Sequence, residues 1–195
     1  MIIETAKKPA TYADLEALPP HVVGEILFGT LVTHPRPHRR HGGATTALGA
    51  VIPGPYQFGI GGPGGWIFVD EPELHLGPHI VVPDIAGWRR DRMTETDDKA
   101  YFEIAPDWIC EALSPATEKY DKGAKRAIYA AYGVEHLWHI DARARSLETF
   151  TREERSWLLT NTFFDDDDVR AAPFTDITFS LGLLWPFDPP SVPTT

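Results

Sequence analysis

The sequence contains a single cysteine, Cys110, among its 195 residues. One cysteine excludes a disulfide within the chain and makes a reducing, cytosolic environment the default expectation. Cys110 stands among Trp108, Ile109 and Ala112. These neighbours predict a buried thiol, and buried structural thiols are inert.

Long hydrophobic runs are also missing. No apolar stretch approaches the ~20 residues that a membrane-spanning helix requires. The N-terminal stretch "MIIETAKKPATYADLEALPP" lacks the apolar core and the small-residue cleavage site of a signal peptide. We therefore expect a cytoplasmic protein with no membrane partner.

Positive charge is scarce, because 18 Lys and Arg residues stand against 28 Asp and Glu residues and give a net charge of −10. This balance argues against a surface whose overall charge attracts nucleic acid. The most basic stretch is "HPRPHRRHGG", residues 34–43, which suits either phosphate contact or simple solvation. Such a local patch, or a bridging metal ion, can still bind phosphate.

The chain does contain the apolar residues for a core, at 43% of the sequence, and its length suits one domain. Patterns typical of strands alternate with two or three helical segments, and the helix expected at 121–132 lies between two strands. This order predicts an α/β or α+β domain with a mixed sheet. The expected helices are 11–20, 38–52 and 118–133; the expected strands lie in 22–35 (a hairpin), 66–76, 79–88, 107–113, 136–141, 146–152, 156–164 and 174–185.

Three carboxylates stand out by their context. Glu25 interrupts an apolar strand, Asp84 follows the strand "HIVVP", and Glu111 follows "DWIC" on the next strand. Two strand-borne carboxylates 27 residues apart can lie side by side in a sheet. Mg²⁺ is bound by one or two carboxylates together with waters and phosphate oxygens. The alternative is that each is a solvated acid at a strand end.

A nearby cation would orient water or stabilise developing charge at such a site. No lysine follows Glu111 directly, because Leu113 occupies the position two residues later. Lys125 is the best alternative, since one flank of the expected helix carries Asp121, Lys125, Tyr129 and Tyr132. Lys125 could instead form a simple i, i+4 ion pair with Asp121.

Other residues fit a site less well. His34, His38 and His41 could suggest a transition-metal cluster, but the prolines between them break the helix that would align them. The glycine-rich segment 54–65 is no phosphate-binding P-loop, because no Gly-Lys-Ser/Thr follows it. Glu73 is either a residue supporting the metal site or a solvated strand edge. The six tryptophans are expected in the core or an interface.

The sequence resembles a known family in four stretches: "VVGEILFGTLV", "PRPHRRHGGATTALG", "GGPGGWIFVDEPELHLGPHIVVPDIAGWRR" and "DWICEALSPATEKYDKGAKRAIYAAYGVEHLWHID". Together they are similar to the Uma-two family of restriction endonucleases, within the PD-(D/E)xK nuclease superfamily. The similarity covers roughly residues 11–185. It implies a restriction-endonuclease-like core over 1–186, with a central mixed β-sheet flanked by helices, and we expect a disordered tail at 187–195.

The resemblance also implies a Mg²⁺- or Mn²⁺-dependent phosphodiesterase site. Asp84 matches the aspartate of the PD motif, and Glu111 matches the acidic residue of the (D/E)xK half-motif; both would be metal ligands. Leu113 stands where that half-motif has its lysine, and Lys125 matches a helix lysine that replaces it in this family. Glu25 matches an N-terminal acidic residue grouped with the site.

Three further residues are expected to support this site: His41, which resembles a recurring histidine of the family, Asp121 and Glu73. The leading hypothesis is a metal-dependent endonuclease that cleaves nucleic acid, with DNA as the expected substrate and a homodimer as the expected assembly. The alternatives are a binding or interaction module that keeps the fold without turnover, and hydrolysis of another phosphoester.

Overall fold

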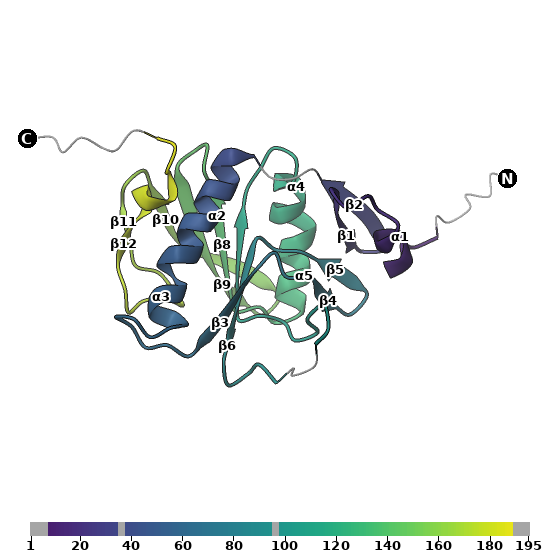
Figure 1. The fold of residues 1–195 in the computed structure, drawn as a ribbon, viewed down its shortest axis with the longest axis horizontal. Coiled ribbons are helices and arrows are strands. Elements are labelled where there is room, and N and C mark those ends of the chain that lie inside the picture. The colour runs from purple at the N-terminus through teal and green to yellow at the C-terminus, as the bar shows by residue number, and fades with distance from the viewer. Residues whose placement is uncertain (1–7, 35–37, 95–97, 189–195) are drawn as a thin grey trace, which may run out of the picture.

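The computed structural model describes residues 8–34, 38–94 and 98–188. Figure 1 shows a large central sheet with helices on either side and the N-terminal hairpin at one end of the molecule. The helices are α1 (Tyr12–Glu16), α2 (Arg39–Val51), α3 (Pro53–Tyr56), α4 (Glu118–Tyr120), the π-helical η1 (Asp121–Lys125), α5 (Arg126–Ala131) and the 3₁₀-helical η2 (Leu181–Leu184). The strands are β1 (Val23–Leu27), β2 (Thr30–His34), β3 (Trp66–Asp70), β4 (Leu74–Leu76), β5 (His79–Val81), β6 (Ile85–Arg89), β7 (Trp108–Ala112), β8 (His136–Asp141), β9 (Ser146–Glu153), β10 (Ser156–Phe164), β11 (Asp168–Val169) and β12 (Phe179–Ser180).

The central sheet has six strands in the order β10-β9-β8-β7-β6-β3. Adjacent strands in this sheet are antiparallel, except for β7 and β8, which are parallel. A parallel pair needs a crossover connection, and here α4, η1 and α5 provide it. The predicted mixed sheet with a helix between two strands is therefore confirmed.

Two apolar cores lie on opposite faces of this sheet, because side chains alternate along each strand. On β7, Trp108 and Cys110 belong to the core under α2, whereas Ile109 belongs to the core under α5. Glu111 follows Cys110 in this alternation along β7 and therefore faces the α5 side.

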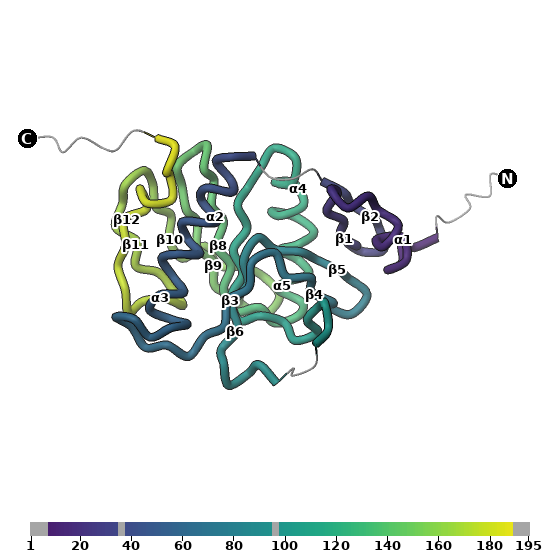
Figure 2. Tube along the Cα trace, in the orientation of Figure 1, coloured from purple at the N-terminus to yellow at the C-terminus, as the bar shows by residue number. Residues whose placement is uncertain are grey.

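The tube in Figure 2 shows the N-terminal and C-terminal segments at opposite ends of the molecule.

The predicted buried residues agree with the structure. Cys110 is fully buried, and burial raises the pKa of its thiol well above the usual value. Five tryptophans are buried, while Trp157 is half-buried against the α5 core and donates a hydrogen bond to the Arg126 carbonyl. The aspartates 165–168 are exposed.

The N-terminal hairpin is confirmed as β1 and β2, with Phe28 and Gly29 at its turn. It belongs to a second sheet of four strands in the order β2-β1-β5-β4. Ile26 on β1 pairs with Ile80 on β5. This pairing brings Glu25 next to the segment that follows β5, where the Val82 N–H donates to Glu25 Oε1 at 2.8 Å.

The strands expected at 66–76 and 79–88 are each two strands, which corrects the sequence prediction. β3 and β6 pair in the central sheet, whereas β4 and β5 pair in the small one. Pro72 and Pro83 stand at the two changes of sheet, where the missing N–H interrupts a ladder.

The helix expected at 118–133 is confirmed, but its buried face differs from the prediction. Ala124, Ala127, Ile128 and Ala131, at i, i+3, i+4 and i+7, suggested an apolar face. Ile128 is buried, yet Ala127 and Ala131 are exposed. Asp121 and Lys125 are buried instead, at 2% and 3% exposure. The helix turns this charged flank toward the sheet because ion pairs hold it there.

None of the helices in the described ranges is long and apolar enough to cross a bilayer. Of the tail expected to be disordered, residues 189–195 lie outside the described part of the chain. Asp188 lies inside it and forms ion pairs with Arg40 and, at 3.1 Å, with Arg145.

Candidate active site

Asp84 and Glu111 lie opposite each other at one end of the β6–β7 pair. The antiparallel register joins Ile85 with Cys110 and Ala86 with Ile109, so the next step brings Asp84 opposite Glu111. Side chains at opposing positions point to the same face with Cβ atoms about 5 Å apart. The Ala112 N–H donates to Asp84 Oδ2 at 2.7 Å and fixes that carboxylate at the strand end. The structure thus brings the two strand carboxylates together.

Lys125 reaches this pair from the crossover helix. Its Nζ lies 2.8 Å from Glu111 Oε1, 3.2 Å from Glu25 Oε1 and 3.4 Å from Asp121 Oδ1. It also donates to the Val82 carbonyl at 3.3 Å. The i, i+4 ion pair and the site contact, which the sequence left as alternatives, therefore occur together.

Glu25 and Tyr129 complete the buried cluster around Lys125. Glu25 Oε1 accepts a hydrogen bond from the Val82 N–H at 2.8 Å, which ties β1 to the segment before Asp84. The Tyr129 hydroxyl donates to Glu111 Oε1 at 2.6 Å. We did not predict Tyr129 as a site residue, although its position four residues after Lys125 was the available signal.

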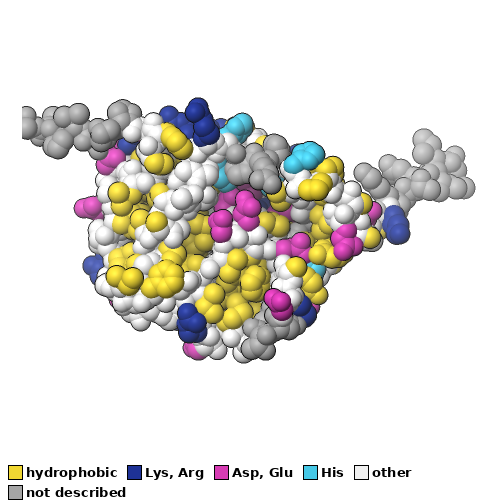
Figure 3. All heavy atoms as spheres, in the orientation of Figure 1, with side chains coloured by type: hydrophobic (Ala, Val, Ile, Leu, Met, Phe, Trp, Pro, Cys, Tyr) yellow, Lys and Arg dark blue, Asp and Glu magenta, His cyan; other side chains and the backbone are white. Residues whose placement is uncertain are grey.

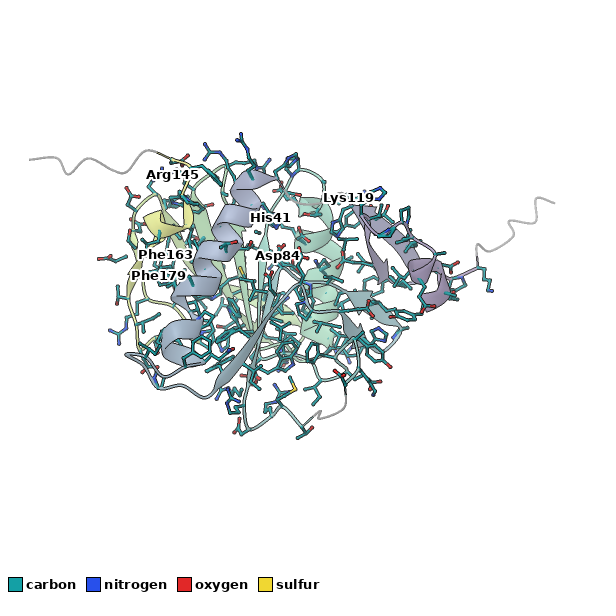
Figure 4. The ribbon with its side chains drawn as sticks, in the orientation of Figure 1. His41, Asp84, Lys119, Arg145, Phe163 and Phe179 are labelled. Atoms are coloured by element: carbon teal, nitrogen blue, oxygen red, sulfur yellow. The ribbon has the colours of Figure 1, made fainter. Side chains whose placement is uncertain are left out.

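His41 enters the site from the first turn of α2. Its Nε2 lies 2.6 Å from Asp84 Oδ1, while its Nδ1 is buried without a hydrogen-bond partner among the described residues. Figure 4 places His41 and Asp84 side by side, between α2 and the α4–α5 helix. The resemblance had suggested His41 only as a supporting residue, and the structure gives it direct contact with the proposed ligand.

Glu73 and the histidines are the candidate residues that remain to be placed. Glu73 pairs with His75 at 2.6 Å and does not line this pocket, so the structure does not bring it to the site. His34 lies 3.7 Å from Glu25 Oε2, whereas His41 contacts Asp84. His34, His38 and His41 all line the carboxylate pocket, but His34 and His41 contact different carboxylates.

Burial and like charges govern protonation in the cluster. Burial raises the pKa of Glu111 well above its usual value, and Asp121, Asp84 and Glu25 act in the same direction against Lys125. Burial lowers the pKa of Lys125, but Glu111 and Glu25 outweigh it, so that pKa lies well above its usual value. For His41, burial is likewise outweighed by the hydrogen bond and charge of Asp84, which raise its pKa. Acidic groups outnumber the one lysine in this cluster, and burial with the neighbouring acids favours the protonated form of Glu111.

The donor chemistry of this cluster fits a hard divalent cation. Asp84 and Glu111 present carboxylate oxygens, and Mg²⁺ is commonly held by one or two carboxylates with water and phosphate completing its shell. A carboxylate oxygen that already accepts one hydrogen bond keeps further lone-pair capacity. Among the described residues, no group of three His, Cys, Asp or Glu residues is arranged to hold a metal ion. A cation held by Asp84 and Glu111 would take the rest of its shell from solvent and substrate.

The pocket above these carboxylates is small, with a volume of about 50 Å³. Besides the carboxylates and Lys125, its walls include His38, Ser114 and Thr117. Figure 3 shows Asp and Glu side chains gathered near the middle of this face of the molecule. A pocket of this size has room for a cation and a few waters, since one water needs at least ~10–15 Å³.

A solved structure shares this fold. The crystal structure of "a putative nuclease belonging to DUF820 from Anabaena variabilis ATCC 29413" matches with a TM-score of 0.72 and 21% sequence identity, covering 91% of this chain and 98% of that one. The fold predicted from the sequence, a central mixed sheet flanked by helices, is confirmed by this similarity. No curated protein matches the chain.

The family comparison covers nearly the whole length. The model of the Uma2 family, described as "Putative restriction endonuclease", matches residues 9–183. This range contains every residue of the cluster, from Glu25 on β1 to Tyr129 on α5. The resemblance inferred from short motifs is therefore confirmed, and the chain belongs to the Uma2 family.

Proposed function

We propose that this protein hydrolyses phosphodiester bonds of nucleic acid, with DNA as the expected substrate and Mg²⁺ or Mn²⁺ as the cofactor. The observation that carries the proposal is the convergence of Asp84, Glu111 and Lys125 on one pocket, with Glu25 paired to Lys125 at 3.2 Å. Family membership supports the same reaction class.

Asp84 and Glu111 would hold the cation. When bound, it would neutralise charge on the phosphate and lower the pKa of the attacking water. The chain's own residues keep these two ligands in place. The Ala112 N–H and His41 hold the two oxygens of Asp84, while Lys125 and Tyr129 both contact Oε1 of Glu111. Among the described residues, Glu111 Oε2 has no hydrogen bond within the protein.

Lys125 is the lysine of the pocket and provides a fixed positive charge beside the reacting phosphate. Its distance of 2.8 Å to Glu111 shows that a helix lysine reaches the position next to the proposed ligand. Preorganised charge of this kind acts strongly where water is excluded. Glu25 contributes indirectly, because it holds both Lys125 and the Val82 N–H.

The test is nicking of supercoiled plasmid by purified protein with Mg²⁺ or Mn²⁺, compared with Asp84→Asn and Glu111→Gln. Asp84→Asn keeps an oxygen for the Ala112 N–H and removes the charge. We expect both variants to lose about 100-fold or more in rate. Glu73→Gln is the matched control, since Glu73 lies outside the pocket, and it should cleave like the wild type.

Equal nicking by wild type and Asp84→Asn would contradict the assignment of the site. A wild-type protein that cleaves neither DNA nor RNA and binds no divalent cation would refute the activity. Circular dichroism of each variant separates loss of function from loss of fold.

A second candidate is a binding module that keeps the fold without turnover. It is favoured by the saturation of Lys125, whose ammonium already contacts three carboxylates and a carbonyl. Calorimetric titration with Mg²⁺ and Mn²⁺ distinguishes the two. Nucleic-acid binding without cation uptake supports the module, whereas cation uptake lost in Glu111→Gln supports hydrolysis.

We also propose a homodimer. β10 is the edge of the central sheet, and its nine residues carry no charge. Leu158 and Leu159 on this strand are 48% and 49% exposed. Uncharged exposed edge strands favour pairing with another strand. Light scattering at micromolar concentration should give twice the chain mass, and a monomer mass would refute this proposal.

A further inference from the structure

A second cavity adjoins the carboxylate pocket and has no role in the site described above. Its volume is about 350 Å³, against about 50 Å³ for the carboxylate pocket. Three residues line both: His38, His41 and Ser114. Sites that take small organic ligands have volumes of about 300–1,000 Å³. The carboxylate pocket is therefore too small for a nucleotide, whereas its neighbour is large enough.

The charge of the lining reverses between the two cavities. The carboxylate pocket is lined by Glu71, Asp84, Glu111 and Asp121 against one lysine. The second cavity is lined by Arg39, Arg40 and Arg143, and no Asp or Glu residue is among its described walls. Three arginines around one cavity contrast with a chain whose net charge is −10.

The three guanidinium groups are not equally engaged. Arg40 pairs with Asp188, and Arg143 lies 3.2 Å from both Asp141 and Glu118. Both side chains remain about half exposed. Arg39 is exposed and forms no ion pair with any residue in the described ranges. Arg39 is therefore the arginine of this cavity whose guanidinium can bind an external anion without first breaking an ion pair to a described residue.

The position of this cavity favours a phosphate attached to a longer chain. A planar guanidinium matches phosphate geometry through paired N–H donors. In Figure 3, Lys and Arg side chains gather at the upper edge of the face, next to histidine and above the central acidic group. The basic stretch 34–43, which the sequence left open between phosphate contact and solvation, supplies two of the three arginines.

We propose that the second cavity is a binding site for a backbone phosphate of nucleic acid, next to the phosphate being cleaved. The inference rests on the proposed nucleic-acid substrate. Arg39 contacts the phosphate directly, and Arg40 and Arg143 add positive potential at the rim. His41 stands at the junction of the two cavities, where it holds Asp84.

The experiment is fluorescence anisotropy of a short labelled DNA duplex in EDTA, where cleavage does not interfere, with a labelled single strand as a second probe. Arg39→Gln should raise Kd by about tenfold, the usual effect of losing one hydrogen bond to a charged group. Arg143→Gln should raise Kd by less, because Arg143 adds positive potential without direct contact. The slope of log Kd against log salt should fall by about one for each variant. Arg39→Lys, which keeps the charge, should stay within a few-fold of the wild type.

Arg155→Gln is the matched control, because Arg155 is an exposed arginine in the turn between β9 and β10 and lies outside both cavities. Competition by inorganic phosphate separates the two sources of the anion. If inorganic phosphate displaces the duplex at a concentration equal to that of the duplex phosphates, the cavity is a free-phosphate site and the inference is overturned.

The outcomes separate this inference from the proposed hydrolysis. Wild-type affinity in both Arg39→Gln and Arg143→Gln would overturn the phosphate site and leave plasmid cleavage untouched. Failure of the wild-type protein to bind either labelled probe would overturn it as well. Arginine-dependent binding without plasmid cleavage would support the phosphate site and refute the hydrolysis.

Discussion

Replacement of Lys125 by methionine tests whether the buried cluster depends on its single ammonium. Lys125 is 3% exposed and lies within 3.4 Å of Glu25, Glu111 and Asp121. Removal of one partner from a buried ion pair costs about 3–5 kcal/mol, because a charge remains buried without compensation. Three carboxylates lose the same cation here, so we expect a loss near the upper value, about 5 kcal/mol at pH 8.

The loss should depend on pH in a defined direction. A carboxyl whose pKa is higher in the folded than in the unfolded chain binds a proton on folding, so its contribution to stability is lost as pH rises above the unfolded value. Burial already raises the pKa of Glu111 above its usual 4.5, and removal of Lys125 raises it further. If the variant binds one more proton than the wild type, the penalty falls by about 1.4 kcal/mol per pH unit on acidification. It should therefore be about 2 kcal/mol at pH 6.

The assay is urea unfolding followed by tryptophan fluorescence at both pH values, since five of the six tryptophans are buried. Lys122→Met is the matched control on the same helix. Lys122 is 42% exposed and forms an i, i+4 ion pair with Glu118 at 2.8 Å, a contact worth about 0.3–0.5 kcal/mol. Equal losses for the two lysine variants, or a Lys125→Met penalty that does not change with pH, would refute the reasoning.

Four further variants test other parts of the structure. Tyr129→Phe removes the hydroxyl that binds Glu111 and should cost about 1–3 kcal/mol in urea unfolding. His139 is buried with neither ring nitrogen hydrogen-bonded in the described part of the chain, and burial lowers its pKa to about 3. The stability of the wild type should therefore fall as pH drops from 6.5 toward 3. His139→Leu should abolish most of that fall. Gly87→Ala would place a Cβ 2.8 Å from an aromatic ring and should destabilise, whereas Gly49→Ala, with open space in α2, should stabilise by about 0.5–1 kcal/mol in thermal melts.

Local patterns predicted the hairpin of β1 and β2 and the crossover helix, because turn residues and helical periodicity act over short distances. They did not predict that 66–76 and 79–88 change sheets at Pro72 and Pro83. A proline shows that a ladder is interrupted, but the partner of the next strand is set by contacts distant in sequence. Ile80, for example, pairs with Ile26.

In the candidate site, too, local patterns predicted some features, whereas others depend on contacts distant in sequence. The pairing of Asp84 with Glu111 was predictable, since both lie on strands that follow one another in the chain. The contact of His41 with Asp84 depends on how α2 packs over the sheet, and the residues alone do not specify it. The helix face was misjudged because apolar periodicity favoured the alanines, whereas ion pairs to Lys125 decide the orientation.

The absent strand lysine has a structural explanation that leads to a last prediction. If β7 continued, position 113 would point to the same side as Glu111. β7 ends at Ala112, however, and Leu113 lines the second cavity instead of the carboxylate pocket. A lysine at this position would enter the arginine-lined cavity and leave the carboxylates uncompensated. Leu113→Lys combined with Lys125→Met should therefore unfold at or below the urea midpoint of Lys125→Met alone. If the double variant recovers to within about 1 kcal/mol of the wild type, well below the cost of about 3–5 kcal/mol for removing one partner of a buried ion pair, strand and helix lysines are interchangeable here.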